Sequence, residues 1–198
     1  STYDSMIDVP SNWGCSDATA ARGNYMVLNP LQKGSALTLS NANLSVSDSG
    51  ATSPCVASTF AVSAGKWYWE VTLGNATAYV GMTTPQSAET SVAYLGYASG
   101  QFIYNGNGAS SSWIDGVQYN YATGTGATTN DVIGVAIDFT ANTVVFYKNG
   151  VSMGTFGSSF LNGRTWTPAY KSNSPSSAVF NFGQRPFAYT CLLYTSPS

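Results

Sequence analysis

Charged side chains are scarce in this sequence. Asp, Glu, Lys and Arg make up 8% of the 198 residues, and histidine is absent. An average domain carries roughly 25% charged residues. Long solvent-facing helices need such residues on their outer faces, so the composition disfavours a helical protein. The seven basic residues form no cluster, which argues against a nucleic-acid partner, because such partners are held by basic stripes.

Metal ligands and nucleophiles are also few. The three cysteines, Cys15, Cys55 and Cys191, show no C-x-x-C spacing. With histidine absent, this argues against a zinc site and against Ser-His-Asp or Cys-His catalysis. Cys15 and Cys55 either form a disulfide in an oxidising compartment or pack as separate small apolar side chains. We therefore expect neither a metal nor a cofactor.

Long apolar runs are missing as well. No stretch approaches the ~20 residues of a membrane-spanning helix. Residues 1–10 lack the charged, apolar and small-residue succession of a signal peptide. These observations predict no membrane partner. A formal charge of −2 with few ionic groups suits a protein on a virion or in an extracellular setting.

Apolar residues do alternate with a period of two. In Lys66–Leu73, the side chains of Trp67, Trp69, Val71 and Leu73 fall on one face. The polar or smaller residues between them fall on the other face. This alternation is typical of a half-buried strand.

A three-stranded meander is predicted further along the chain. Its strands are Val132–Asp138, Thr143–Lys148 and 151–156. The Asn149-Gly150 dipeptide between the last two is a strong hairpin signal, because a type I′ turn needs two positive φ angles.

Shorter strand signals recur at intervals of about ten residues, which predicts an all-β sandwich or barrel. We expect these strands at 25–29, 36–39, 44–47, 55–62, 78–82, 91–95, 101–104, 167–170 and 178–182.

Binding residues are sought in loops, because a rigid β scaffold carries function there. Segments 105–112, 119–129 and 171–176 are rich in small polar residues and are expected to be loops. Exposed Tyr and Trp offer a large contact area with a polar tip. For each ring the alternative is a place in the core. The candidate ligand-binding residues are Tyr97, Tyr104, Trp113, Tyr119, Tyr121 and Lys171.

Five segments in order resemble the motifs of SPRY domains. Residues 65–71 (GKWYWEV) resemble the G-K-x-Y-W-E-V strand, and 79–82 (YVGM) the strand after it. Residues 131–138 (DVIGVAID) and 143–150 (TVVFYKNG) resemble the central hairpin, and 180–187 (FNFGQRPF) the closing segment. Each motif alone is loose, but the five together are specific.

The resemblance implies a concanavalin-like SPRY β-sandwich of two antiparallel sheets that binds partners through loops at one edge. It covers residues 55–190, with 1–54 as an N-terminal lead-in that packs on or completes the sandwich. Residues 191–198 depart from the family pattern and resemble translated sequencing adapter, so we expect a non-native tail.

The lead-in resembles that of SPRY-containing proteins from marine bacteriophages and environmental viral sequences. This implies a module of a virion tail or surface that recognises a host-surface protein or glycan, or other virion proteins. One alternative is a structural decoration domain of the virion.

Another alternative is a carbohydrate-active enzyme of concanavalin-like fold. Glycosidases need two carboxyl groups about 5–10 Å apart, but Glu70 and Glu89 have no carboxylate near them in sequence. The sequence therefore favours a non-catalytic protein. A structural role for Glu70 is expected, with Arg185 as its partner. Asp131 and Asp138 are expected to fix turns rather than to bind a metal.

Overall fold

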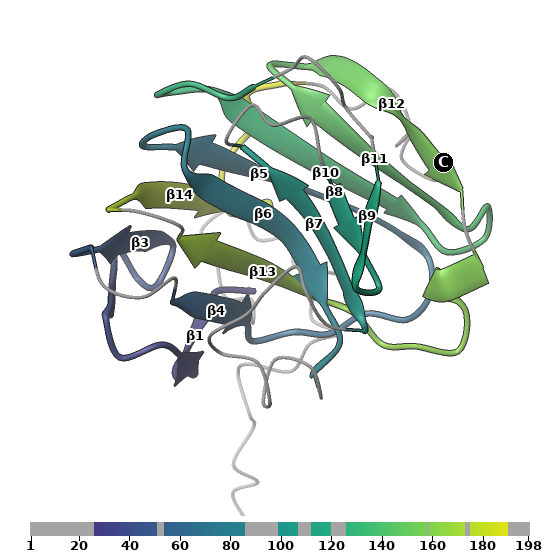
Figure 1. Ribbon diagram of the computed structural model, residues 1–198, viewed down its shortest axis with the longest axis horizontal. Helices are drawn as coiled ribbons and strands as arrows, with labels where there is room; N and C mark the ends of the chain where they lie inside the picture. The colour runs from purple at the N-terminus through teal and green to yellow at the C-terminus, as the bar shows by residue number, and fades with distance from the viewer. Residues whose placement is uncertain are drawn as a thin grey trace, which may run out of the picture.

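The computed structural model describes residues 26–50, 54–85, 99–106, 112–119, 126–157, 159–172 and 175–189. Within these ranges, fourteen strands form two antiparallel sheets of seven strands each (Figure 1). Besides the strands, the described residues include a 3-10 turn, η1 (Ser159–Leu161). The predicted all-β sandwich of two antiparallel sheets is therefore confirmed.

The first sheet, here called sheet A, has β1 and β9 at its edges. From one edge to the other it contains β1 (Leu28–Lys33), β4 (Cys55–Ser58), β13 (Thr167–Ser172), β6 (Ala78–Thr83), β7 (Gln101–Asn105), β8 (Ser112–Ile114) and β9 (Val117–Tyr119).

The second sheet, sheet B, has β12 and β2 at its edges. Its order is β12 (Val151–Gly157), β11 (Thr143–Lys148), β10 (Val132–Asp138), β5 (Lys66–Leu73), β14 (Ser177–Asn181), β3 (Ser45–Asp48) and β2 (Leu37–Ser40). The β11–β12 register shifts between Val145 and Tyr147, which places a bulge in the edge strand β12. Residues 28–48 thus supply one strand to sheet A and two to sheet B.

The main core lies between the two sheets. Alternate residues of each strand point inward and interdigitate, as expected for sheets packed face to face. Aromatic rings fill its centre, where Phe102 stacks on Phe146 at 5.3 Å and on Phe160 at 5.4 Å between ring centroids. Trp166 and Tyr170 are also fully buried. These contacts fix the two sheets relative to each other.

The outer face of sheet A is buried too. Cys55, Tyr79, Ile103 and Ala169 form a second apolar cluster there, and none is more than 4% exposed. Cys15, the other member of the proposed disulfide, lies outside the described residues. The buried state of Cys55 agrees with a small apolar side chain in a packed environment.

The strongest strand predictions are confirmed by the structure. β5, β10 and β11 have the predicted bounds, and β12 extends one residue beyond its prediction. Asn149 and Gly150 have φ angles of 50° and 78°, as the type I′ turn requires. The predicted strand at 91–95 lies outside the described residues.

Asp131 and Asp138 fix the turns at the two ends of β10, as predicted. Asp131 accepts hydrogen bonds from Thr128 and from the Asn149 side chain. Asp138 accepts one from the Ala141 backbone at 2.9 Å. Burial opposes ionisation of both groups, but these hydrogen bonds outweigh it and lower the pKa of each carboxyl.

The predicted pairing of Glu70 with Arg185 is wrong. Glu70 is 3% exposed and accepts hydrogen bonds from the backbone amides of Ala188 and Tyr189, at 2.7 and 2.9 Å, and from the Tyr68 hydroxyl. Backbone donors satisfy the buried carboxylate, so no cation is needed. Residues 186–189, here called the C-terminal clasp, are thereby held against the outer face of sheet B.

Among the described residues, no helix is long and apolar enough to cross a membrane. In the same part of the chain, no group of three His, Cys, Asp or Glu side chains is placed to hold a metal ion.

Candidate binding surface

The predicted binding residues divide among different environments. Tyr104 lies in β7 with its ring in the core, 2% exposed and 5.6 Å from Phe146. A ligand at the surface cannot reach it, so its expected exposure is corrected. Tyr104 ends the predicted strand 101–104 and adjoins the predicted loop 105–112, which suggested a ring near the surface. Its ring instead points from sheet A into the core between the two sheets.

Lys171 was expected in a surface loop at 171–176, but it belongs to β13 and is 2% exposed. Its ammonium group lies 4.9 Å from the centre of the Tyr79 ring, a cation–π contact. Burial lowers the pKa of Lys171, and the neighbouring Cys55 opposes this shift. The strand extends two residues beyond the predicted end at Tyr170, which moves Lys171 from the loop to the outer face of sheet A.

Trp113 lies in β8 and is half-buried. Its neighbour Ile114 points into the core at 3% exposure, so Trp113 points to the outer face of sheet A. It pairs with Ile103 of β7 and with Gln118 of β9. Trp113 and Lys171 therefore share one face of sheet A.

Tyr119 is the last residue of β9 and pairs with Ser112 in the ladder. Tyr97 and Tyr121 lie outside the described residues. The stretch that holds the candidates from Tyr97 to Tyr121 contains β7, β8 and β9. The β8–β9 turn is at the end of the sandwich where β7 starts, whereas Asn105 at the end of β7 and Ser172 at the end of β13 are at the other end. The predicted binding edge therefore corresponds to two separate regions at opposite ends of the sandwich.

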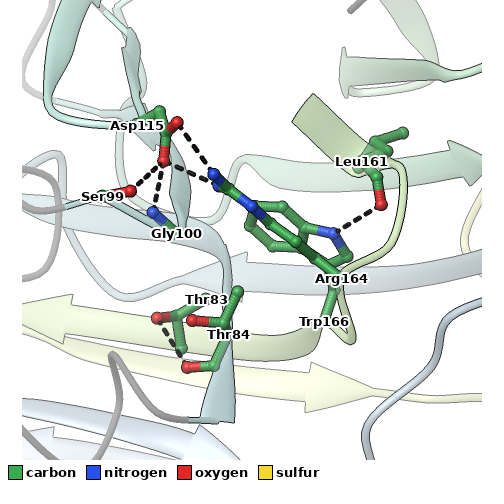
Figure 2. A network of polar contacts seen from close by, with 8 residues as sticks. All are labelled: Thr83, Thr84, Ser99, Gly100, Asp115, Leu161, Arg164 and Trp166. Carbon is green, nitrogen blue, oxygen red and sulfur yellow. Dashed lines mark hydrogen bonds and ion pairs between the residues drawn. The ribbon is translucent and has the colours of Figure 1, made fainter. Parts of the chain in front are cut away.

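The β8–β9 turn carries a polar site that is partly exposed to solvent. Asp115 lies at its tip with φ 52°, followed by Gly116 with φ 83°. Arg164, in the connection between η1 and β13, reaches Asp115 with both terminal nitrogens, at 2.8 and 3.3 Å (Figure 2). Ser99 and the backbone amide of Gly100 donate to the same carboxylate.

These contacts explain the electrostatics of the site. The hydrogen bonds from Arg164 hold the pKa of Asp115 at about 2, with smaller contributions from Gly100 and Ser99. The same pairing raises the pKa of Arg164. One carboxylate thus ties together three chain segments that are remote in sequence. Because Asp115 and Arg164 retain 32% and 35% side-chain exposure, the pair remains in contact with solvent.

The β8–β9 hairpin surface is defined here by Trp113, Asp115 and Arg164. Val117 is 53% exposed, but it pairs with Ile114 and therefore lies on the opposite face of the hairpin from Trp113. The combination of one ring and a fixed ion pair is suited to binding and contains no general acid–base pair. Asp115 and Arg164 were missed at the sequence level. The Asp115-Gly116 dipeptide is a hairpin signal, and the turn could have been predicted from it.

A sequence model of the SPRY domain matches residues 66–185. Solved structures with the same fold include the SPRY domain of human HERC1, with a TM-score of 0.65 and 16% identity over 80% of this chain and 99% of that one. The TRIM65 PSpry domain matches with a TM-score of 0.65 and 17% identity, covering 79% of this chain and 91% of that one. Stonustoxin matches with a TM-score of 0.63 and 18% identity, over 79% of this chain and 27% of its own.

Proposed function

The chain belongs to the SPRY domain family, and from that premise we propose that it is a non-catalytic module that binds a partner protein through the β8–β9 hairpin surface. SPRY domains are generally protein-interaction modules and are typically non-catalytic. The observation that carries the choice of surface is the fixation of Asp115 by donors from two other segments, Ser99-Gly100 and Arg164. A turn that is already ordered loses little conformational entropy when a partner binds.

The chemistry of the surface favours a protein partner. A half-buried Trp113 supplies apolar contact, while Asp115 and Arg164 supply polar groups beside it in the adjoining turn. Interfaces with an aromatic anchor and a polar rim have this composition. A flat sugar ring could also stack on Trp113, so glycans are the second class of ligand to be tested.

We further propose a virion or extracellular setting, with a host-surface molecule or another virion protein as the partner. Its support is the resemblance of the lead-in to phage and environmental viral sequences. The low proportion of charged residues agrees with that setting. A purely structural decoration role is the competing proposal, and it predicts no affinity for host cells.

The test begins with selection of binding peptides from a displayed library on the purified chain, and with a glycan array in parallel. Each enriched ligand is then titrated against Trp113→Ala. Loss of an anchor at an interface typically costs about 2 kcal/mol or more. The matched control is Leu31→Ala, which removes a 91% exposed apolar side chain from β1, five strands from β8 in the same sheet.

The proposal is supported if peptides are enriched and Trp113→Ala weakens them while Leu31→Ala does not, with both variants folded. Peptides that bind Trp113→Ala with full affinity place the site elsewhere. Enrichment on the glycan array alone contradicts a protein partner. Binding of the labelled wild-type chain to host cells would support a recognition role. Absence of such binding would support a purely structural decoration role.

A further inference from the structure

Three Asn-Gly dipeptides lie in the described residues: Asn105-Gly106, Asn149-Gly150 and Asn162-Gly163. In this dipeptide the glycine backbone nitrogen can attack the side-chain carbonyl carbon of asparagine. Ammonia leaves, a succinimide ring forms, and water opens the ring to aspartate or isoaspartate. The reaction needs a mobile asparagine side chain and a glycine nitrogen that is not engaged elsewhere. The fold decides which of the three dipeptides meets both conditions.

Asn105-Gly106 does not meet them. Asn105 is 7% exposed at the end of β7. The Gly106 nitrogen donates to the Ala78 carbonyl oxygen at 3.0 Å, so its attack would require that this hydrogen bond break. Burial also keeps out the water that opens the ring.

Asn149-Gly150 is held at the side chain instead. The Asn149 amide nitrogen donates to Asp131 at 2.7 Å, and its oxygen accepts from the Val132 backbone amide at 2.8 Å. Rotation of the side-chain carbonyl toward the Gly150 nitrogen would break both bonds. One of them involves a charged acceptor, and such bonds are stronger than those between neutral groups.

Asn162-Gly163 has neither form of protection. Both residues are exposed, in the turn that follows η1. No hydrogen bond joins the Asn162 side chain or the Gly163 nitrogen to another described residue. The space around Gly163 is open, because a Cβ added there would meet no atom within 4 Å. The side chain can therefore sample the geometry of attack without unfolding.

We propose that Asn162 is a site of spontaneous deamidation in this chain, whereas Asn105 and Asn149 are protected by the fold. The product carries a new carboxylate two residues before Arg164. The isoaspartate form also adds a methylene to the backbone of the connection that brings Arg164 to Asp115 (Figure 2). Deamidation at Asn162 therefore alters the connection that carries Arg164, whose contact with Asp115 fixes the β8–β9 turn.

The test is incubation of the folded chain in mildly alkaline buffer, followed by proteolysis and tandem mass spectrometry. Fragment ions must assign the site, because Asn149 and Asn162 lie between the same two basic residues, Lys148 and Arg164. The expected result is a mass increase of one dalton at Asn162. Its extent should exceed that at Asn149 at least about tenfold, since protection by two hydrogen bonds costs more than 1.4 kcal/mol to remove.

The same incubation in denaturant separates the fold from the local sequence. There the three dipeptides should react at similar rates. A difference that persists in denaturant would overturn the structural argument, and so would faster reaction at Asn105 or Asn149 in the folded chain. Asn162→Gln should lose the signal at that position, and the absence of any reaction at Asn162 in the folded wild type would also refute the proposal.

Discussion

Glu70 is a buried carboxylate whose partners come from the end of the described chain. Its two oxygens accept the consecutive backbone amides of Ala188 and Tyr189. A single mid-strand residue in β5 thus holds the C-terminal clasp on sheet B. The sequence indicated a structural acid there but not its partners, because backbone donors leave no trace in residue identity.

Replacement of Glu70 by Gln should destabilise the fold. The amide retains one acceptor and turns an NH2 group toward a backbone N–H, so one buried donor loses its partner. The expected loss is roughly 1–3 kcal/mol in the free energy of unfolding, measured by chemical denaturation. Arg185→Gln is the control and should leave stability within about 0.5 kcal/mol, as for most surface changes. Equal losses of unfolding free energy in the two variants would instead support an ion pair between Glu70 and Arg185.

Gly150 is required for two separate reasons. Its φ of 78° disfavours any side chain, and a Cβ there would lie 2.6 Å from Cδ1 of Tyr189 in the clasp. Gly163 isolates the first reason, since it has φ 69° and open space around it. Gly163→Ala should cost about 1 kcal/mol for backbone strain alone.

Gly150→Ala should cost the same strain plus about 1–3 kcal/mol of overpacking against Tyr189. Thermal or denaturant unfolding measures both variants. The additional cost should disappear when Gly150→Ala is combined with Tyr189→Ala and compared with Tyr189→Ala alone. If the two glycine variants are equally stable, Tyr189 does not restrain position 150.

At the scale of elements, most strands were predictable, including short ones such as β2, β3 and β7, but the two shortest, β8 and β9, were not. β5, β10 and β11 have six to eight residues and show clear alternation. β8 and β9 have three residues each, which is too few for a period to appear. Their pairing depends on the Asp115-Gly116 turn and on Arg164, a residue 49 positions away from Asp115. Such remote pairing cannot be derived from local pattern.

The Asp115–Arg164 link should make stability depend on pH in acid. The pKa of Asp115 is lowered from 3.8 to about 2 in the folded state. Its stabilising contribution is therefore complete above the unfolded pKa and is lost as the pH falls toward 2. Because both side chains are about a third exposed, we expect a contribution of roughly 1 kcal/mol or less.

Denaturation of wild type and Arg164→Gln between neutral pH and about pH 2 measures this contribution. The difference in unfolding free energy should shrink as Asp115 becomes protonated. Arg185→Gln, which removes an exposed cation that forms no ion pair among the described residues, controls for a general effect of lost positive charge. A difference that stays constant down to pH 2 would contradict the link.

At the scale of the whole molecule, the sandwich needs strands that lie before the matched family segment. β1 completes sheet A, and β2 and β3 complete sheet B, although the SPRY match begins at residue 66. Leu28, Leu37 and Val46 from these strands are buried in the core. The class of fold was predictable from the sequence. That residues 28–48 contribute strands to both sheets follows only from the strand pairing in the structure.

A chain that begins at residue 55 should fail to fold cooperatively, whereas one that begins at residue 26 should keep a melting transition. Burial of three large apolar side chains contributes roughly 1.5–3 kcal/mol each. Their sum approaches the 5–15 kcal/mol of net stability typical of a domain. Circular dichroism on heating compares the two chains. A normal transition in the shorter one would show that β1–β3 are dispensable.

The bulge in β12 bears on whether copies of this protein can pair through the edge of sheet B. With 8% charged residues, copies of the molecule repel one another only weakly. β12 is an edge strand of seven residues that contains neither a charge nor a proline, the usual barriers to edge pairing. The register shift and the positive φ of Gly154, 110°, break its outer row of backbone donors and acceptors. We therefore expect the bulge to disfavour pairing between copies of the molecule through β12.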